Sequence, residues 1–300
     1  MIKRYIHNKA LELGFSHCGF SRCEPLENLR SFYILYIQEN RFASLDYLKR
    51  YAEKRLNPEM LVPGARTVIA LLMNYYPWDI IPETDNFLVS KYAYGNDYHV
   101  LMRKRMDDLI GFMKLTFSDN RFIAFVDSGT VLEKAWAQRC GLGWQGKNTL
   151  ILNKSKGSFF FIGIILTDLE LEPDHPETDH CGDCNKCVSA CPTGALNIPY
   201  QLNMPRCISY QTVENKSDIP GDLKEKMKDW IYGCDICQDV CPYNRFARPH
   251  SIPAWMPSET MASMRKKDWI ALTEPGFDNL FAGSAVKRLG YKRLMRNILR

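Results

Sequence analysis

The stretch CGDCNKCVSACPTGAL, residues 181–196, contains four cysteines in the spacing CxxCxxCxxxCP. In this spacing three thiolates hold one iron–sulfur cluster, while the fourth cysteine, which precedes a proline, binds a second cluster. Zinc is the alternative, because CxxC pairs also bind zinc, but zinc sites usually combine two separate pairs. The stretch therefore predicts an iron–sulfur unit that needs further cysteines from elsewhere in the chain.

Those further cysteines lie in CDICQDVCP, residues 234–242, which repeats the last three positions of the same spacing. Ile231 stands at the first position and cannot bind iron, so Cys207, in MPRCISY, is the expected replacement. The last cysteine of each run binds the other run's cluster. The expected ligands are Cys181, Cys184, Cys187 and Cys241 for cluster one, and Cys191, Cys207, Cys234 and Cys237 for cluster two. We expect the other three cysteines, Cys18, Cys23 and Cys140, to be buried, inert thiols.

The composition is that of an ordinary globular protein, with 46% hydrophobic and 24% charged residues in 300. The length favours about two domains. No run approaches the roughly 18 apolar residues of a membrane helix, and MIKRYIHNKALELGF is typical of a first helix, not of a signal peptide. Eleven cysteines without an export signal indicate metal ligation in a reducing, cytoplasmic compartment. The net charge of +5 is weak evidence for a nucleic-acid partner.

The first 170 residues predict a mixture of helices and strands. Apolar runs predict strands within 66–78, 120–129 and 158–166, and amphipathic patterns predict helices near 44–55, 98–117 and 130–142. The acidic, proline-containing segment 167–180 is expected to end this unit. We therefore divide the chain into residues 1–172, a cysteine-rich unit at 173–255 and a basic helical tail at 256–300.

Longer motifs bring out a resemblance over essentially the whole chain. The stretch DSGTVLEKAWAQRCGLGWQGKNTLILN, residues 127–153, is followed by the ferredoxin-like cysteine run, then by RCISY and YGCDICQDVCPYNR. The other matching stretches are YLKRYAEKR, RTVIALLMNYYP, YGNDYH and GSAVKRLGYKRLMRN. Together, in this order, they resemble the epoxyqueuosine reductases. No GxGxxG follows a strand, so a Rossmann nucleotide site is not indicated.

The resemblance implies an enzyme that reduces epoxyqueuosine to queuosine at the wobble position of tRNA, the last step of queuosine biosynthesis. It implies cobalamin and two [4Fe-4S] clusters as cofactors, and an external low-potential electron donor. The implied α+β fold has a nitroreductase-like and reductive-dehalogenase-like cobalamin domain. A two-cluster ferredoxin-like domain and a short helical C-terminal segment, part of a HEAT-like module, follow it. We expect a monomer. The sequence leaves open whether cobalt attacks a substrate carbon or only donates electrons.

Asp127 matches the aspartate to which the family assigns proton donation. It ends a predicted strand, where a carboxyl group is well placed for general acid catalysis, and burial beside a corrin would raise its pKa. The alternative is that Asp127 caps the helix that follows, although Ser128 can also supply that cap. His99 and Asp97, in GNDYH, either orient substrate or cap the helix that begins there.

Further contacts follow from the matching segments. The expected cobalamin-binding residues are Arg50, Ser90, Asp127, Gly129, Lys147, Asn148, Thr149, Ser209 and Gln211. The alternatives for Lys147, Asn148 and Thr149 are a contact with tRNA phosphate and an ordinary loop between helix and strand.

The tail predicts a tRNA contact. On one continuous helix Arg288, Lys292, Arg296 and Arg300 would form a basic stripe along tRNA phosphates, unless it is only a solvated face. Lys154 and Lys156 are a second candidate contact.

Two rival functions remain at the level of sequence. A reductive dehalogenase-like reductase of a small molecule would use the same cofactors, but this chain lacks the twin-arginine signal and the tyrosine acid typical of those enzymes. A ferredoxin-like electron carrier would not need the long unit before residue 170.

Overall fold

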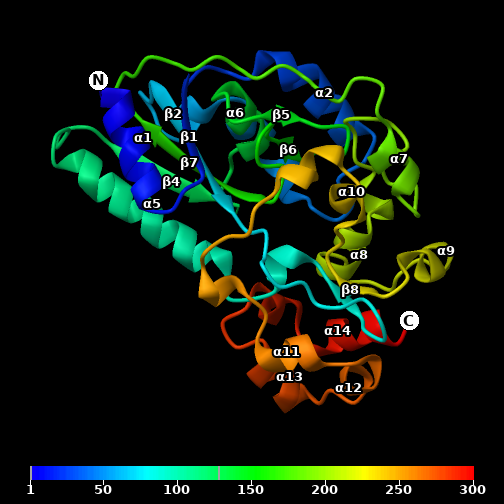
Figure 1. Cartoon of the computed structure of the whole chain (residues 1–300). Coiled ribbons are helices and arrows are strands. Elements are labelled where there is room, and N and C mark those ends of the chain that lie inside the picture. Colours follow the sequence, from blue (N-terminus) through cyan, green and yellow to red (C-terminus); the bar gives the residue numbers. More distant parts are fainter. Residues whose placement is uncertain (1, 128) are drawn as a thin grey trace.

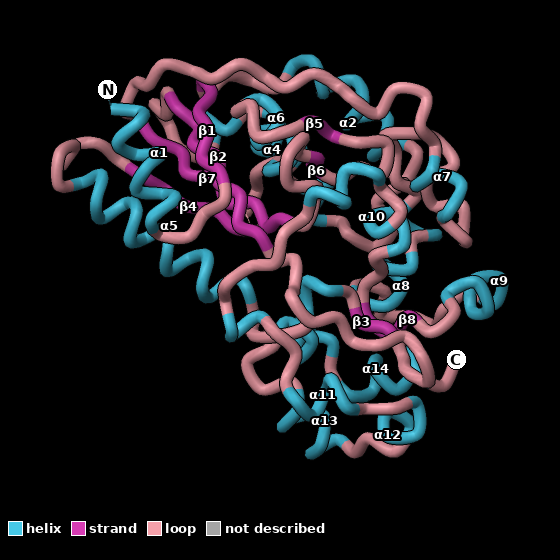
Figure 2. Tube along the Cα trace, viewed as in Figure 1, coloured by secondary structure: helices cyan, strands magenta, loops and turns pink. Residues whose placement is uncertain are grey.

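The computed structural model describes residues 2–127 and 129–300. Ser128, the alternative helix cap, lies outside the described residues. The described part of the chain forms a four-stranded main sheet covered by helices, a cysteine-rich part beside it and a helical C-terminal part below it (Figures 1 and 2). In the described part of the chain, no helix has both the length and the apolar character needed to cross a membrane.

The main sheet has four antiparallel strands in the order β1–β2–β7–β4. Their bounds are His17–Arg22 for β1, Thr67–Asn74 for β2, Phe122–Val126 for β4 and Phe160–Thr167 for β7. β2 and β7 occupy the centre, and their side chains are buried on both faces, as their continuous runs of valine, isoleucine and leucine predict. The three strands expected from the sequence are therefore confirmed.

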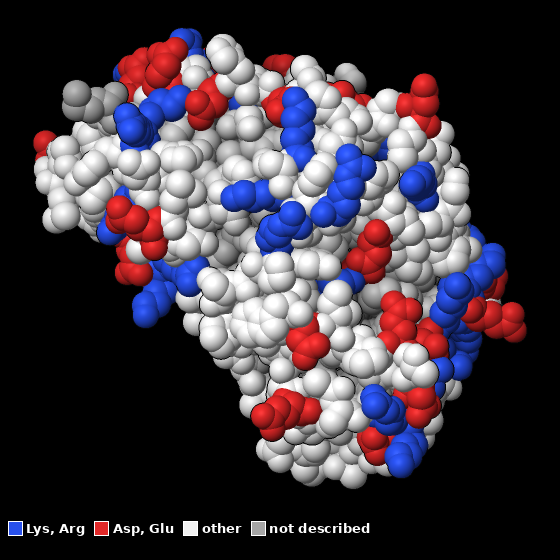
Figure 3. Space-filling model, in the orientation of Figure 1, with Lys and Arg blue, Asp and Glu red and all other residues white. Residues whose placement is uncertain are grey.

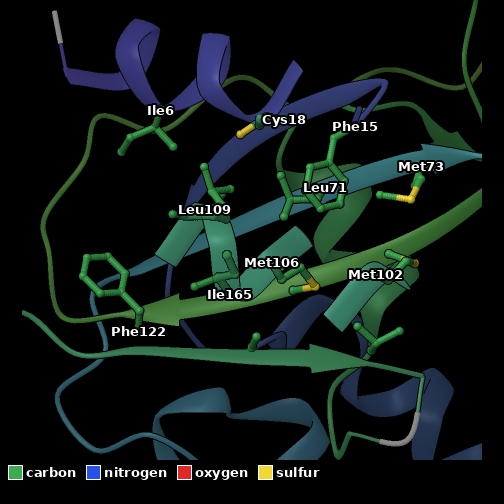
Figure 4. Close-up of a cluster of buried hydrophobic side chains, with 14 of the residues drawn as sticks. Ile6, Phe15, Cys18, Leu71, Met73, Met102, Met106, Leu109, Phe122 and Ile165 are labelled. Carbon is green, nitrogen blue, oxygen red and sulfur yellow. The ribbon is translucent and has the colours of Figure 1, made fainter. Parts of the chain in front are cut away.

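Helices cover both faces of this sheet. α1 (Ile2–Glu12) and α5 (Tyr98–Lys114) pack on one face, while α2 (Glu27–Gln38), α4 (Ala52–Leu56) and α6 (Glu133–Arg139) pack on the other. Successive side chains of a strand point to opposite faces of its sheet, so β2 contributes to both cores. Ile69, Leu71 and Met73 face α5, while Val68, Ala70 and Leu72 face α6. Figure 4 shows the first core, where Met102, Met106 and Leu109 of α5 meet the strands.

The cysteine-rich part consists of short helices joined by long loops. Its helices are α7 (Lys186–Ala190), α8 (Ile208–Val213), α9 (Gly221–Lys224) and α10 (Ile236–Asp239). α7 and α10 lie against each other, although about 50 residues separate them in the chain. The small hairpin of β5 (Trp144–Gln145) and β6 (Ile151–Leu152) joins this part to the sheet.

The C-terminal helices pack on a segment from the first third of the chain. β3 (Leu88–Val89) pairs with β8 (Trp230–Tyr232), and Ile81, Val89 and Tyr94 share a core with Trp269 and Phe281. The remaining helices are α3 (Tyr47–Arg50), α11 (Glu259–Ser263), α12 (Lys266–Ile270), α13 (Glu274–Leu280) and α14 (Tyr291–Ile298). Contacts therefore cross both expected domain boundaries, and the division at 172 and 255 stays a prediction.

Candidate active site and cluster sites

Four of the predicted ligands line one small cavity, which we call cysteine site 1. These are Cys181, Cys184, Cys187 and Cys241, around a volume of about 50 Å³. Three come from the first cysteine run and one from the end of the second, so α7 and α10 must lie together to form the site. Cys184 is exposed, which places this site at the surface.

The loops of cysteine site 1 are held by hydrogen bonds from the first part of the chain. The Trp144 indole N–H donates to Cys181 Sγ at 3.5 Å. The Lys147 ammonium donates to the Gly182 carbonyl at 2.6 Å, and Gly182 has a φ of 48° that favours glycine. Asp179 accepts from the Cys181 N–H at 2.8 Å. The hairpin and the cysteine run are thus built as one unit.

The other four predicted ligands line a larger cavity of about 260 Å³, cysteine site 2. They are Cys191, Cys207, Cys234 and Cys237. Cys207 lies beside the run at 234–241, in the place for which Ile231 is unsuitable, and Ile231 itself is fully buried in the C-terminal core. The structure thus brings together both sets that the spacing predicts.

The cavities suit a cluster better than a single ion. Zinc needs its thiolates about 2.3 Å from one point. Across residues 2–127 and 129–300, no three His, Cys, Asp or Glu side chains converge closely enough to hold one metal ion. The thiols surround a space instead, as the ligands of a four-iron cluster must.

The three cysteines outside these sites are in different surroundings. Cys18 and Cys140 are buried, and burial raises the pKa of each thiol far above its usual value. Burial also raises the pKa of the half-buried Cys23 to about 12. The expected burial therefore holds for Cys18 and Cys140 and not for Cys23, and an inert role for the three thiols stays a prediction.

A third cavity, of about 420 Å³, lies next to cysteine site 2, and we call it the Asp127 cavity. The two cavities share Cys207, Ser209, Tyr75, Tyr92 and Leu202 in their walls. Aromatic rings make much of the remaining lining, including Tyr98, Phe160 and Phe161. Cys207 therefore lies in the wall between cysteine site 2 and the Asp127 cavity.

Asp127 stands at the mouth of this cavity, directly after β4. Its backbone has a φ of 52°, and its side chain is 64% exposed. The Asp127 N–H donates to Glu133 Oε1 at 2.5 Å, and Asp127 Oδ2 lies 3.2 Å from His99 Nε2. α6 begins only at Glu133, six residues later, and its cap position is Leu132. The alternative in which Asp127 caps this helix is therefore wrong.

The electrostatics at Asp127 differ from the expectation. The hydrogen bond from His99 lowers the pKa of Asp127, against a smaller opposing effect of burial. Without a corrin beside it, Asp127 thus has a lowered pKa because its carboxyl group faces an imidazole, and the rise expected beside a bound corrin stays a prediction. Burial, and then the charge of Asp127, raise the pKa of Glu133 to about 8. Glu133 is the carboxyl group here that holds a proton near neutrality.

His99 is fixed between two carboxylates at the start of α5. Asp97 caps the helix by accepting from the His99 N–H at 3.0 Å, and its Oδ1 also lies 2.6 Å from His99 Nδ1. The hydrogen bond with Asp127, followed by the bond with Asp97, raises the pKa of His99 above its ordinary value despite partial burial. The capping reading is confirmed for Asp97, while a role of His99 and Asp97 in orienting substrate stays a prediction.

The expected cobalamin-binding residues do not all line one cavity. Ser209 lines the Asp127 cavity, and Ser90, Asn148 and Thr149 line cysteine site 2. Ser90 donates to Asp235, while Asn148 donates to the Cys237 carbonyl at 3.2 Å. Four further expected residues also lie away from the wall of the Asp127 cavity. Arg50 is exposed on α3, and Gly129 lies beside Phe125. Lys147 lies at cysteine site 1, and Gln211 donates to the Pro205 carbonyl.

The expected basic stripe is wrong as a single helix. Gly290, with a φ of 81°, separates the 3-10 turn η7 (Ala285–Leu289) from α14, so Arg288 lies off the helix that carries Lys292. Arg288 pairs with Glu214 at 2.6 Å on the rim of the Asp127 cavity. Arg296 donates to the carbonyls of Gln211, Asn215 and Ser217. Lys292 is exposed.

Lys154 and Lys156, the second candidate contact with tRNA, also have partners within the protein. Lys154 and Lys156 are exposed on the turn before β7. Lys154 pairs with Glu177 at 3.1 Å, and Lys156 lies 3.4 Å from the Ser16 carbonyl. Both ammonium groups stay at the surface.

Sequence reasoning missed three groups at these sites. They are Glu133, Tyr98 and Lys134, whose ammonium group lines cysteine site 2 and donates to the Thr149 carbonyl at 2.9 Å. Glu133 and Lys134 lie in the motif already quoted, and acidic and basic residues at the start of a buried helix are the signal for them. Tyr98 stacks on Phe161 at 3.8 Å between ring centroids.

Comparison with known proteins agrees with this architecture. Residues 55–128 match the family described as "Epoxyqueuosine reductase QueG, DUF1730", and residues 180–244 match a 4Fe-4S double cluster binding domain. An epoxyqueuosine reductase from Cellulophaga algicola is 44% identical over 294 residues, covering 98% of this chain and 95% of that protein. The Escherichia coli enzyme is 36% identical, covering 96% of this chain and 77% of its own.

Solved structures agree over nearly the whole chain. An epoxyqueuosine reductase bound to an epoxyqueuosine-modified tRNA-Tyr stem loop matches with a TM-score of 0.90 at 31% identity, over 99% of this chain and 80% of that one. The Bacillus subtilis enzyme, with its catalytic aspartate loop swung out of the active site, matches equally well, with the same coverage. This chain therefore belongs to the epoxyqueuosine reductase family.

Proposed function

We propose that this chain reduces epoxyqueuosine to queuosine at the wobble position of tRNA. One observation carries the proposal most strongly: the carboxyl group of Asp127 faces a cavity whose wall contains Cys207, a thiol of cysteine site 2. A proton donor and an electron source would thus meet at a single site. The relatives named above are called epoxyqueuosine reductases, and one of the solved structures contains the modified stem loop.

The eight thiols would hold two [4Fe-4S] clusters, as the two four-cysteine cavities support. Cysteine site 1 lies at the surface and cysteine site 2 lies against the Asp127 cavity. An external low-potential one-electron donor would then deliver electrons at cysteine site 1. Because the clusters need reduced thiols and the substrate is a tRNA, we place this activity in the cytoplasm. The arrangement is complete within a single chain, in keeping with a monomer.

Cobalamin would bind at the Asp127 cavity, which shares Cys207 and Ser209 with cysteine site 2. The aromatic wall suits the flat, largely apolar corrin, and Ser209 offers a hydroxyl group at the boundary with cysteine site 2. When bound there, cobalamin would supply a metal centre able to pass electrons to the substrate.

The chain's own residues supply the remaining chemistry. Asp127 would protonate the oxygen that leaves the epoxide, from a position within hydrogen-bond reach of His99. The aromatic lining would exclude water from the reacting carbon atoms. Glu133 holds the Asp127 backbone N–H and so fixes the direction in which the carboxyl group points.

Surface charge supports binding of the tRNA backbone. Several Lys and Arg side chains lie near one another across the middle of the face in Figure 3, with few Asp or Glu side chains between them. Among the predicted contacts, Lys154, Lys156 and Lys292 remain exposed, and Arg288 sits on the rim of the cavity. Such contacts give salt-dependent affinity without sequence reading.

The test is a reconstituted reaction. Anaerobically prepared protein with iron, sulfide and cobalamin is given a chemical reductant and tRNA that carries epoxyqueuosine. Mass spectrometry of the digested nucleosides should show queuosine, lighter by one oxygen atom. Unchanged epoxyqueuosine in the presence of both reduced clusters and reduced cobalamin, verified by their spectra, would refute the proposal.

A further inference from the structure

Removal of an epoxide oxygen consumes more protons than one carboxyl group holds. Two C–O bonds break, one carbon–carbon π bond forms, and the oxygen departs as water after taking up two electrons and two protons. The electrons come through the clusters from the external donor. A single Asp127 carboxyl group carries only one proton, so a source of protons must lie behind it. This inference rests on the proposed function.

The group behind Asp127 is the imidazole of His99. Its Nε2 lies 3.2 Å from Asp127 Oδ2, and its Nδ1 lies 2.6 Å from Asp97 Oδ1. Asp97 is itself fixed, because its N–H donates to the Gly283 carbonyl at 2.7 Å and its side chain caps α5. The histidine therefore has one ring nitrogen held by a fixed carboxylate and the other aimed at the proton donor.

This geometry restricts where the protons sit. With Nδ1–H donated to Asp97, a hydrogen bond at Nε2 requires one further proton, either on the imidazole or on Asp127. Two carboxylates in contact with one ring favour the imidazolium form. The raised pKa of His99 and the lowered pKa of Asp127 agree with a resting state in which His99 carries the proton.

The surroundings contain further charges that act on this pair. The charged groups near His99 and Asp127 are Asp97 from the start of α5, Lys134 from α6, and Arg288 from η7 with its partner Glu214, and the titratable groups Tyr98 and Glu133 also lie there. Glu214 offsets Arg288, which it contacts at 2.6 Å. The direct partners of the imidazole are both acidic, so they dominate its protonation.

We propose that His99 stores the proton at this site and passes it to Asp127 before each of the two protonations of the departing oxygen. Asp97 is the residue that positions His99. His99 Nε2–H passes its proton to the Asp127 carboxylate, and Asp127 passes it to the oxygen. The imidazole side chain is 36% exposed, so solvent replaces its proton before the second transfer. The relay moves protons only and leaves the electron count unchanged.

Two variants test the relay in the holoenzyme. H99Q keeps a polar side chain of similar reach but cannot store a proton, and D97N keeps a good helix cap while removing the negative charge. We measure single-turnover conversion of epoxyqueuosine-tRNA against pH, together with tRNA affinity and the reduction spectra of the clusters and cobalamin. The binding and spectroscopic readouts should match those of the unaltered protein for both variants.

For the unaltered protein the rate should fall as pH rises through the raised pKa of His99, because the imidazolium form is lost. H99Q should be slower by about 10²-fold, the lower end for general acid–base catalysis, and added imidazole should restore part of the rate. D97N should move the midpoint of the fall to lower pH, since the imidazolium loses a stabilising charge. A purely structural His99 would show neither imidazole rescue nor a midpoint shift.

Two results would overturn the relay. One is H99Q turning over at the original rate with the original pH profile. The other is a loss of tRNA binding or of cofactor reduction that accounts for the slower rate. If the unaltered protein itself leaves epoxyqueuosine unchanged, the proposed function is wrong. If the unaltered protein is active and H99Q is equally active, only the relay is wrong.

Discussion

At the scale of single residues, Asp127 combines two properties that conflict in a general acid. Its carboxyl group faces the cavity where a proton is needed, yet the hydrogen bond with His99 lowers its pKa and favours the carboxylate. A carboxylate can serve as the last carrier of a proton that a neighbouring group stores. The pair should therefore be treated as one acid with two sites, and its titration belongs to the pair.

Replacement of Asp127 tests the final carrier. D127N has nearly the same shape but cannot pass a proton, so conversion of epoxyqueuosine should fall by about 10²- to 10⁴-fold. Because Asp127 lines neither cysteine site, the cluster spectra should be unchanged. Single-turnover assays followed by nucleoside mass spectrometry provide the measurement. A D127N protein within a factor of about three of the original rate would rule out this role.

At the scale of elements, the contact between α7 and α10 decides which thiols share a cavity. The helices carry the two cysteine runs, and their packing brings Cys241 to site 1 and Cys191 to site 2. Sequence neighbours in each run are thereby divided between two cavities. Each cluster then ties together parts of the chain that lie about 50 residues apart.

This crossing can be tested with two serine variants in one run. C241S should damage the surface cluster at site 1, while C234S, seven residues earlier, should damage the inner cluster at site 2. Each variant should retain about half of the iron, and electron paramagnetic resonance should show a different surviving signal in each. Loss of the same signal from both variants would contradict the crossing.

Two glycines show how tightly the sheet and helices pack. A Cβ atom on Gly19 of β1 would lie 2.1 Å from the Cys140 carbonyl oxygen, whereas one on Gly111 of α5 meets nothing within 4 Å. G19A should therefore destabilise the protein by at least about 1–3 kcal/mol through overpacking. G111A, the matched control, should stabilise it by about 0.5–1 kcal/mol, because alanine favours a helix. Denaturant unfolding of both variants checks the difference, and equal effects would be inconsistent with this packing.

Local patterns in the sequence predicted elements well and their partners less well. β2, β7 and α5 follow from continuous or periodic apolar residues, and the eight cysteines follow from a spacing that thiolate chemistry demands. The break at Gly290 and the recruitment of residues 81–94 to the C-terminal core were not predictable in this way. The position of His99 beside Asp127 also depends on tertiary packing, because 28 residues separate the two in the chain.

At the scale of the whole molecule, the C-terminal segment is part of the cysteine-rich framework. Arg296 donates to the carbonyl of Gln211 in α8 and to those of Asn215 and Ser217 after it, and Asn297 donates to the carbonyls of Thr212 and Ile231. These bonds tie α14 to α8, which directly follows Cys207, and to β8, which precedes Cys234. The tail therefore supports cysteine site 2 from outside, in addition to any contact with tRNA.

The two roles of the tail can be separated with neighbouring residues. R296Q leaves buried carbonyls without donors, so it should cost about 1–3 kcal/mol of stability and loosen the inner cluster. K292Q changes an exposed side chain, so stability should be unaffected. If Lys292 contacts a phosphate, the slope of log affinity for tRNA against log salt should fall by about 0.7–0.9 in K292Q. Thermal unfolding and filter binding over a salt series give both quantities.

Two outcomes would contradict these roles. A K292Q protein with the original slope would show that Lys292 does not contact tRNA. An R296Q protein of full stability would show that Arg296 is free to contact tRNA instead.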